Sequence, residues 1–156
     1  MIKAQFGMVG LGTMGRNLVL NIAGHGFAVC GYDRDVAQQQ RLISEGKDKP
    51  VYVAASLQEL VNSLEKPARI MLLVPAGKIV DNVLAELVLL LQKDDIVIDG
   101  GNSHFTDTDR RYTQLQTTGI HFMGMGISGG EEGARFGPSM MPGSNEQSFN
   151  AVKNIL

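Results

Sequence analysis

The sequence has little cysteine, little excess charge and few candidate metal ligands, and each lack excludes a class of protein. Its one cysteine, Cys30, has no partner for an internal disulfide and cannot build a cysteine zinc site. The three histidines show no ligand spacing, so we expect no metal. The net charge of -2 gives no general attraction to nucleic acid or to an anionic membrane.

Long hydrophobic runs are also missing. No apolar run approaches the ~20 residues that cross a bilayer. The N-terminus, Met1-Ile2-Lys3-Ala4-Gln5, lacks the basic-then-apolar pattern of a signal peptide. We therefore expect a cytoplasmic protein that binds neither nucleic acid nor membrane.

The chain has 156 residues, 44% of them hydrophobic and 19% charged, which is enough for one domain with one core. Short apolar runs alternate with helical stretches, a pattern typical of βαβ units. We expect an α/β fold: a Rossmann-type, doubly wound, mostly parallel sheet with helices on both faces. The expected strands are 5–9, 27–32, 51–53, 69–74, 96–98 and 120–125. The expected helices are 14–25, 36–44, 56–64, 80–91, 106–118 and 144–156.

Cap residues mark the start of three helices. Ser56 and Glu59 have capping-box spacing. Thr106 can cap the helix that follows it, and Ser144 with Gln147 suggests a further cap.

The last quarter of the chain predicts a long loop and then a helix. The stretch 124–144 is rich in glycine and is expected to be a loop. The final helix continues to Leu156 without a C-terminal cap. We therefore expect residues 1–156 to be a single domain cut from a longer protein.

A glycine pattern follows the first strand and opens the first helix. It fits G-x-G-x-x-G and comprises Gly10, Leu11, Gly12, Thr13, Met14 and Gly15. Gly10 permits the tight turn, Gly12 lets the backbone approach a pyrophosphate, and Gly15 allows close helix–strand packing. The free N–H groups at the helix start would then face the phosphates of a dinucleotide. The alternative is a simple strand–helix turn.

The end of the second strand bears on the choice of dinucleotide. Asp33 lies 18 residues after Gly15, where a carboxylate can accept hydrogen bonds from an adenosine ribose. That carboxylate favours NAD, whereas the guanidinium of Arg34 can pair with the 2′-phosphate of NADP. Both can also be ordinary turn residues. We expect NAD or NADP, with a slight preference for NAD.

Other polar or glycine-rich turns follow the fourth, fifth and sixth strands, at the same edge of the sheet. The first could lie against the cofactor and comprises Val74, Pro75 and Ala76. Asn102 follows the next strand and offers both a donor and an acceptor. The third comprises Ser128, Gly129 and Gly130, whose hydroxyl and N–H groups could hold a carboxylate or hydroxyls of a substrate. Because ligands of open α/β sheets bind at this edge, we expect the turns to converge.

Several charged residues have a simpler interpretation. Arg110 and Arg111 are expected on a solvated helix face, and Asp107 is spaced to pair with Arg111. Glu131 and Glu132 are adjacent, which suits loop and helix-start positions better than a paired-carboxylate site.

Three stretches resemble the 6-phosphogluconate dehydrogenase family, and the resemblance covers essentially the whole chain. Residues 124–143 read GMGISGGEEGARFGPSMMPG, and residues 98–103 read IDGGNS. The turn 10–15, with Arg16-Asn17-Leu18 behind it, is also similar. Other β-hydroxyacid dehydrogenases share Ser-Gly-Gly but usually lack the two glutamates and the Gly-Pro-Ser-Met-Met-Pro that follow.

The resemblance implies oxidative decarboxylation of 6-phosphogluconate to ribulose 5-phosphate, within the pentose phosphate pathway and gluconate utilisation, by a homodimer. It implies that Asn102 and residues 128–130 contact the sugar acid and the nicotinamide side. The dinucleotide would contact residues 10–15, the 33–35 turn with Asp35, and the 74–76 loop.

The chain departs from the family in three respects. NADP-dependent members usually have Asn-Arg-Ser or Asn-Arg-Thr where this chain has Asp33-Arg34-Asp35, and commonly have lysine in place of Pro75. The family's base is a lysine and its acid a glutamate, both beyond this segment, and an all-helical domain follows. We therefore expect weak dinucleotide binding and no catalytic residue in this chain. The alternatives are another β-hydroxyacid dehydrogenase and a dinucleotide-binding module without catalysis.

Overall fold

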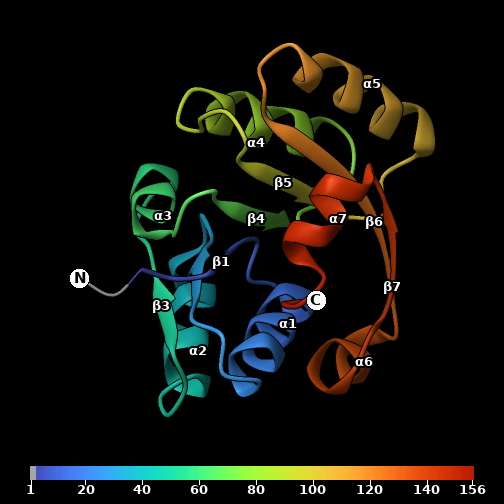
Figure 1. The fold of residues 1–156 in the computed structure, drawn as a ribbon. Coiled ribbons are helices and arrows are strands. Elements are labelled where there is room, and N and C mark those ends of the chain that lie inside the picture. Colours follow the sequence, from blue (N-terminus) through green and yellow to red (C-terminus); the bar gives the residue numbers. More distant parts are fainter. Residues whose placement is uncertain (1–2) are drawn as a thin grey trace.

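The computed structural model describes residues 3–156, which form a seven-stranded sheet with helices around it (Figure 1). The strands are β1 Phe6–Val9, β2 Val29–Tyr32, β3 Val51–Val53, β4 Arg69–Leu72, β5 Ile96–Asp99, β6 His121–Ser128 and β7 Ser139–Gly143. The helices are α1 Thr13–Gly24, α2 Val36–Glu45, α3 Leu57–Ser63, α4 Lys78–Val88, α5 Phe105–Gln116, α6 Gly130–Phe136 and α7 Glu146–Val152.

The sheet has the strand order β3-β2-β1-β4-β5-β6-β7. All neighbours pair in parallel except β6 and β7, which are antiparallel. The chain leaves β1 in one direction toward β3 and then returns to build β4 on the other side. The carboxyl ends of β1 and β4 therefore flank the point where the strand order reverses, which is where open α/β sheets bind ligands.

The central strands are buried on both faces of the sheet, because their alternate residues enter different cores. In β4, Ile70 and Leu72 belong to the core under α3, α4 and α5, whereas Met71 belongs to the core under α1, α2 and α7. Val97 in β5 alternates in the same way with its neighbours Ile96 and Ile98. This two-sided burial explains the near-continuous apolar runs of the strands and confirms the doubly wound α/β fold.

Of the predicted caps, the first is confirmed and the other two are wrong. Ser56 caps α3 by accepting from the N–H of Glu59 at 3.1 Å. The N-cap of α5 is His104 rather than Thr106, and that of α7 is Asn145 rather than Ser144. The ring nitrogen of His104 accepts from the N–H of Thr106, and the amide oxygen of Asn145 accepts from the N–H of Ser148. These side chains therefore occupy the cap positions.

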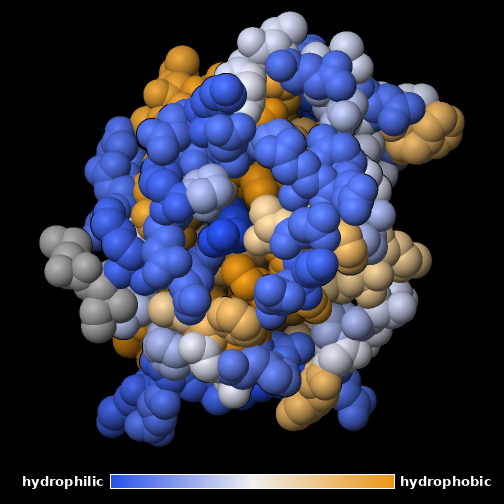
Figure 2. Space-filling model, in the orientation of Figure 1, coloured by the Kyte–Doolittle hydropathy of each residue, from blue (hydrophilic) through white to orange (hydrophobic). Residues whose placement is uncertain are grey.

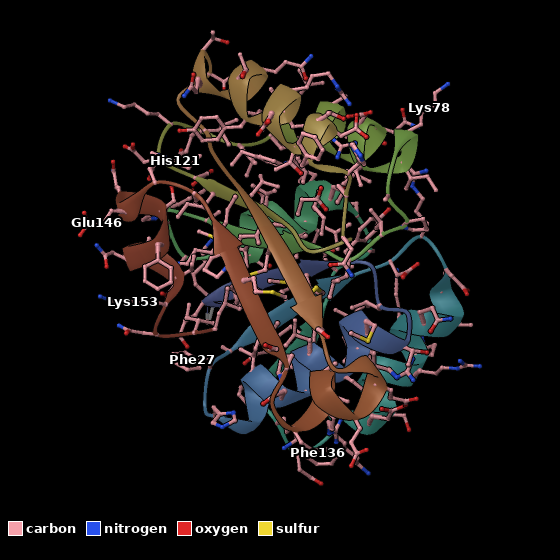
Figure 3. The ribbon with its side chains drawn as sticks, turned by 90° about the vertical axis from the view of Figure 1, so that its right-hand side faces the viewer. Phe27, Lys78, His121, Phe136, Glu146 and Lys153 are labelled. Atoms are coloured by element: carbon pink, nitrogen blue, oxygen red, sulfur yellow. The ribbon has the colours of Figure 1, made fainter. Side chains whose placement is uncertain are left out.

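Residues 124–144 do not form the expected loop. The strand β6 runs on to Ser128, α6 follows, and β7 returns antiparallel beside β6 (Figure 3). Two glycines of this stretch, Gly124 and Gly126, lie in β6 and allow close packing. A Cβ on Gly124 would lie 2.6 Å from Cγ2 of Thr108, and one on Gly126 would lie 3.2 Å from Cε of Met141. Helix α7 is also shorter than predicted, because it ends at Val152 rather than at Leu156.

Hydrophilic residues cover most of the face shown in Figure 2. Hydrophobic groups lie at its upper left beside α4, in the hollow at its centre, and along its right-hand side over β7 and the adjacent ends of α5 and α6. Phe105, Phe136 and Met141 are exposed in these elements. Among residues 3–156, no helix has both the length and the apolar character to span a bilayer.

Candidate functional site

The turn between β1 and α1 contains backbone approaches that only glycine permits. Gly10 has a φ of 96°, and a Cβ there would lie 2.3 Å from the carbonyl oxygen of Leu73. A Cβ on Gly15 would lie 1.9 Å from the carbonyl oxygen of Gly10. Gly12 differs, because a Cβ there would meet nothing within 4 Å. The turn thus has the tight bend at Gly10 and the close packing at Gly15 that the pattern predicts, with open space at Gly12.

The first turn of α1 presents backbone N–H groups without a side-chain cap. The helix begins at Thr13, followed by Met14, and its N-cap Gly12 has no side chain to accept from them. The first N–H groups of a helix have no intrahelical partner, and the helix dipole places partial positive charge there. This end of α1 can therefore hold an anion such as a diphosphate.

A cleft of about 330 Å³ opens beside this turn. Its walls come from the turn after β1, from residues 32–35 at the end of β2, and from residues 73–75 after β4. Helices α2, α3 and α4 complete the lining with Gln38, Leu57, Ile79 and Val83. The structure therefore brings Gly10, Gly12, the 33–35 turn, Val74 and Pro75 to one cleft, although these segments lie far apart in the sequence. Ala76 lies next to this wall in the chain but does not line the cleft.

The carboxylate of Asp33 supports the glycine turn. Its Oδ2 accepts from the N–H of Leu11 at 2.7 Å, and its Oδ1 accepts from the N–H of Asp35 at 2.8 Å. The side chain of Asp35 in turn caps α2 by accepting from the N–H of Ala37 at 2.9 Å. An ionised carboxylate has about four acceptor positions. Asp33 can therefore accept a ribose hydroxyl while it holds the turn.

Arg34, at the rim of the cleft, forms an ion pair with Glu86 of α4. The N···O distance is 2.7 Å, and the side chains are 68% and 53% exposed. Such an exposed pair contributes only about 0–1 kcal/mol to stability. The position of the pair still matters, because Glu86 adds a carboxylate beside Arg34, which is the one cationic side chain among residues 3–156 that lines the cleft.

Asn102 uses both polar groups of its side chain on the backbone of β6. Its Oδ1 accepts from the N–H of Ile127 at 3.2 Å, and its Nδ2 donates to the carbonyl oxygen of Ile127 at 3.3 Å. Its φ is 53°, in the left-handed region. This clamp places Asn102 beside Ser128, so two of the predicted substrate residues come from adjacent strand ends. Asn102 also lines a second hollow of about 370 Å³, between α5 and the β6–β7 pair.

The segment after β6 turns sharply into α6. Gly129 has a φ of 129° and Gly130 one of 61°, so both positions favour glycine. Glu131 and Glu132 lie in the first turn of α6, as predicted. Helix α6 packs against α1, where Glu131 accepts from Nδ2 of Asn17 at 3.3 Å. The 128–130 turn is therefore anchored to the helix that begins at the phosphate turn.

Arg111 is buried, which contradicts its predicted place on a solvated face. Its side chain has no exposed area, whereas that of Arg110 is 42% exposed, as predicted. The predicted pairing with Asp107 is also wrong, because Asp107 pairs with Arg110 at 3.2 Å. Arg111 points inward from α5 and donates to Asp81 (2.8 Å) and to Asp99 (3.3 Å). The hydrogen bond from Arg111 is the main cause of the lowered pKa of Asp81.

The candidate site contains polar side chains and glycine turns, and it lacks a cluster of metal ligands among the described residues. Within residues 3–156, no group of three or more histidine, cysteine or acidic side chains is placed to hold a metal ion. Cys30 is buried in the core, as predicted, and burial raises the pKa of its thiol. The arrangement therefore suits the binding of an anion and hydroxyl groups.

Comparison with known proteins identifies the family. The family model described as the NAD binding domain of 6-phosphogluconate dehydrogenase matches residues 5–156. The chain belongs to the 6-phosphogluconate dehydrogenase family. This result favours that family over the other β-hydroxyacid dehydrogenases that the sequence left open.

Known members of the 6-phosphogluconate dehydrogenase family are much longer than this chain. The decarboxylating 6-phosphogluconate dehydrogenase 1 of Saccharomyces cerevisiae is 50% identical over 156 residues, which are 99% of this chain and 32% of the yeast protein. The human decarboxylating enzyme is 49% identical over 157 residues, again 32% of its length. The chain thus spans about a third of the relatives that it matches.

A solved 6-phosphogluconate dehydrogenase has the same architecture. The Plasmodium falciparum enzyme, described in apo form and in complexes with its cofactor NADP+ and its substrate 6-phosphogluconate, superimposes with a TM-score of 0.94 at 37% identity. The match covers 97% of this chain and 33% of that one.

Sequence reasoning missed two residues near the site of this 6-phosphogluconate dehydrogenase domain. The sequence pattern predicts a surface position for Arg111 and gives no signal for Glu86. Their partners lie 30 and 52 residues away in the chain, at Asp81 and Arg34. The only local signal was that Arg111 lies four residues from the buried Leu115, on the inner face of α5.

Proposed function

We propose that the chain binds an adenine dinucleotide and is the cofactor-binding domain of a 6-phosphogluconate dehydrogenase. The observation that supports this most directly is the uncapped N-terminus of α1 beside the open space at Gly12, at the reversal point of the sheet. The whole enzyme would convert 6-phosphogluconate and NAD(P)+ to ribulose 5-phosphate, carbon dioxide and NAD(P)H. We propose that it acts as a cytoplasmic homodimer and that an all-helical domain completes it.

The order of the strands supports an orientation for the dinucleotide. With the diphosphate on Gly12, the adenosine would lie toward β2, where Asp33 can accept from the ribose. The nicotinamide half would lie on the other side of β1, toward the ends of β4 and β5. There it would be next to Val74 and Asn102, and the sugar acid would lie between Asn102 and the 128–130 turn. When bound, the dinucleotide supplies the hydride acceptor.

The residues of this chain bind and orient, and the base and acid of the reaction must come from elsewhere. Oxidation of a hydroxyl followed by decarboxylation needs a positioned proton acceptor and donor. Lysine and glutamate are missing from the described residues that line the cleft and from those that line the hollow at Asn102. We propose that no catalytic residue lies in residues 1–156.

We propose a modest preference for NAD over NADP. A 2′-phosphate would enter a rim that holds Asp33, Asp35 and Glu86 around Arg34, and the guanidinium already has a carboxylate partner at 2.7 Å. A free 2′-hydroxyl needs only an acceptor, which Asp33 provides. The net charge around Arg34 thus favours the cofactor that lacks the additional phosphate.

Calorimetric titration of the purified chain with NAD and with NADP tests this function. We expect weak saturable binding of both, with the smaller dissociation constant for NAD, and no reduction of either in the presence of 6-phosphogluconate. Absence of binding would contradict the dinucleotide site. Robust turnover would show that a base and an acid lie within the chain, and a clear preference for NADP would show that Arg34 outweighs its acidic neighbours.

A further inference from the structure

A buried guanidinium lies behind the two turns that would flank the nicotinamide. Arg111 reaches from α5 and lines neither the dinucleotide cleft nor the hollow at Asn102. We infer that Arg111 is a positioning residue for the nicotinamide half of the cofactor. It would act by holding the 74–77 turn and the 99–103 turn in one fixed arrangement. This inference rests on the proposed dinucleotide binding.

The hydrogen bonds of Arg111 end on both turns. Nη2 donates to the carbonyl oxygen of Gly77 at 3.0 Å, at the end of the turn after β4. Nη1 donates to Oγ of Ser103 at 3.1 Å and to Oδ2 of Asp99 at 3.3 Å, at the two ends of the turn after β5. Nε donates to Asp81, in the first turn of α4. One side chain therefore connects α5 with two strand ends and a helix start.

The turn that Arg111 supports contains a residue of the proposed site in the left-handed region. Asn102 has a φ of 53°, a conformation that asparagine adopts more readily than most L-residues. Asp99 and Ser103 flank it, are hydrogen-bonded to one another through the Ser103 hydroxyl, and both accept from Arg111. Asp99 also accepts from the N–H of Gly101 at 3.0 Å. The guanidinium thus fixes the backbone on both sides of Asn102.

The two turns are also packed tightly against one another. A Cβ on Gly101 would lie 2.6 Å from the carbonyl oxygen of Val74, so the backbones of the turns are in contact. A displacement of one turn is therefore transmitted to the other. Val74 would touch the nicotinamide half and Asn102 the reacting side, so their relative position decides where the ring lies.

A gain in folding stability does not by itself explain why the charged side chain of Arg111 is buried behind these turns. Burying an ion pair costs desolvation, and well-packed apolar residues often replace such a pair without loss of stability. A planar guanidinium with five donors can instead satisfy a carbonyl, a hydroxyl and two carboxylates in one geometry. The planar set of donors therefore suits Arg111 to holding the 74–77 and 99–103 turns in one arrangement.

The experiment compares the whole dinucleotide with its adenosine half. NAD would extend over both sides of β1, whereas ADP would occupy only the diphosphate and adenosine positions, where it meets the 74–77 turn but not the 99–103 turn. In the Arg111→Met variant we expect NAD to bind about tenfold more weakly and ADP to bind within twofold of the wild type. Arg111→Lys keeps the charge but not the fork, so we expect an intermediate loss for NAD.

Two further variants complete the design. Gln116→Met changes an exposed side chain of the same helix, away from Asp81, and should leave both affinities unchanged. Asp81→Asn removes one partner of Arg111 at a position outside both hollows, and should weaken NAD two- to threefold but not ADP. Because Asp81 is partly exposed, this variant tests the inference even when Arg111→Met does not fold.

Equal losses of NAD and ADP in the folded Arg111 variants, or no loss of either, would overturn the inference. If Arg111→Met does not fold, an unchanged NAD affinity in Asp81→Asn would overturn the inference. A wild-type chain that binds neither ligand would overturn the proposed function and this inference together, so the two failures are distinguishable.

Discussion

The glycines of the β1–α1 turn serve different needs at the scale of single residues. Gly10 and Gly15 have backbone oxygens where a Cβ would lie, at 2.3 and 1.9 Å, so the fold itself requires them. Gly12 has a φ of -60°, which any residue adopts, and open space beside it. The reason for glycine at Gly12 is therefore not found in the fold and fits the approach of a ligand.

Alanine substitutions distinguish a glycine that the fold requires from a glycine that the approach of a ligand requires. Gly15→Ala should lower the free energy of unfolding by several kcal/mol, because the Cβ meets fixed backbone. Gly12→Ala should lower it by about 1 kcal/mol at most, the cost of alanine at an N-cap, and should weaken dinucleotide binding at least tenfold. Urea unfolding and titration with NAD measure both quantities. Gly24→Ala, at the far end of α1, is the matched control and should alter neither the fold nor the affinity. Undiminished affinity in Gly12→Ala would mean that the diphosphate does not approach this turn.

At the scale of elements, helix α4 brings a carboxylate to the end of β2. Glu86 and Arg34 lie 52 residues apart in the chain but 2.7 Å apart in space. The position of α4 over this face of the sheet thus sets the charge that a 2′-phosphate would meet.

Neutralising that carboxylate should shift the cofactor preference. We expect Glu86→Gln to raise NADP affinity about threefold, since Arg34 is then free to pair with the 2′-phosphate, and to leave NAD affinity unchanged. Parallel titrations with the two cofactors provide the ratio. Glu65→Gln makes the same change of charge at a residue outside the cleft and should not move the ratio. If the ratio of NAD affinity to NADP affinity is unchanged in Glu86→Gln, Glu86 does not influence the choice of cofactor.

The elements also show what could be predicted from the sequence. The β1–α1 turn and the alternation of strands and helices were predictable, because their signals, glycine spacing and apolar runs, are local. The strand β7 and helix α6 were not, because the glycines at 124 and 126 look like loop residues until Thr108 and Met141 are seen against them. The burial of Arg111 was equally hidden, since its partners come from distant segments.

At the scale of the whole molecule, the strand order places every proposed ligand contact at one edge. Figure 3 shows this edge opposite His121, which begins β6, and on the side of Lys78, which begins α4. The order β2-β1-β4-β5-β6 sets the sequence of contacts from adenosine to sugar acid. The topology therefore accounts for how residues from five strand ends can act on one extended ligand.

A crystal structure of the chain with NAD tests the central claim most directly. The account predicts the diphosphate against the N–H groups of Gly12 and Thr13, the adenosine ribose beside Asp33, and the nicotinamide beyond β4 near Asn102. A nucleotide bound away from the amino end of α1, or bound there in the reverse direction, would contradict it.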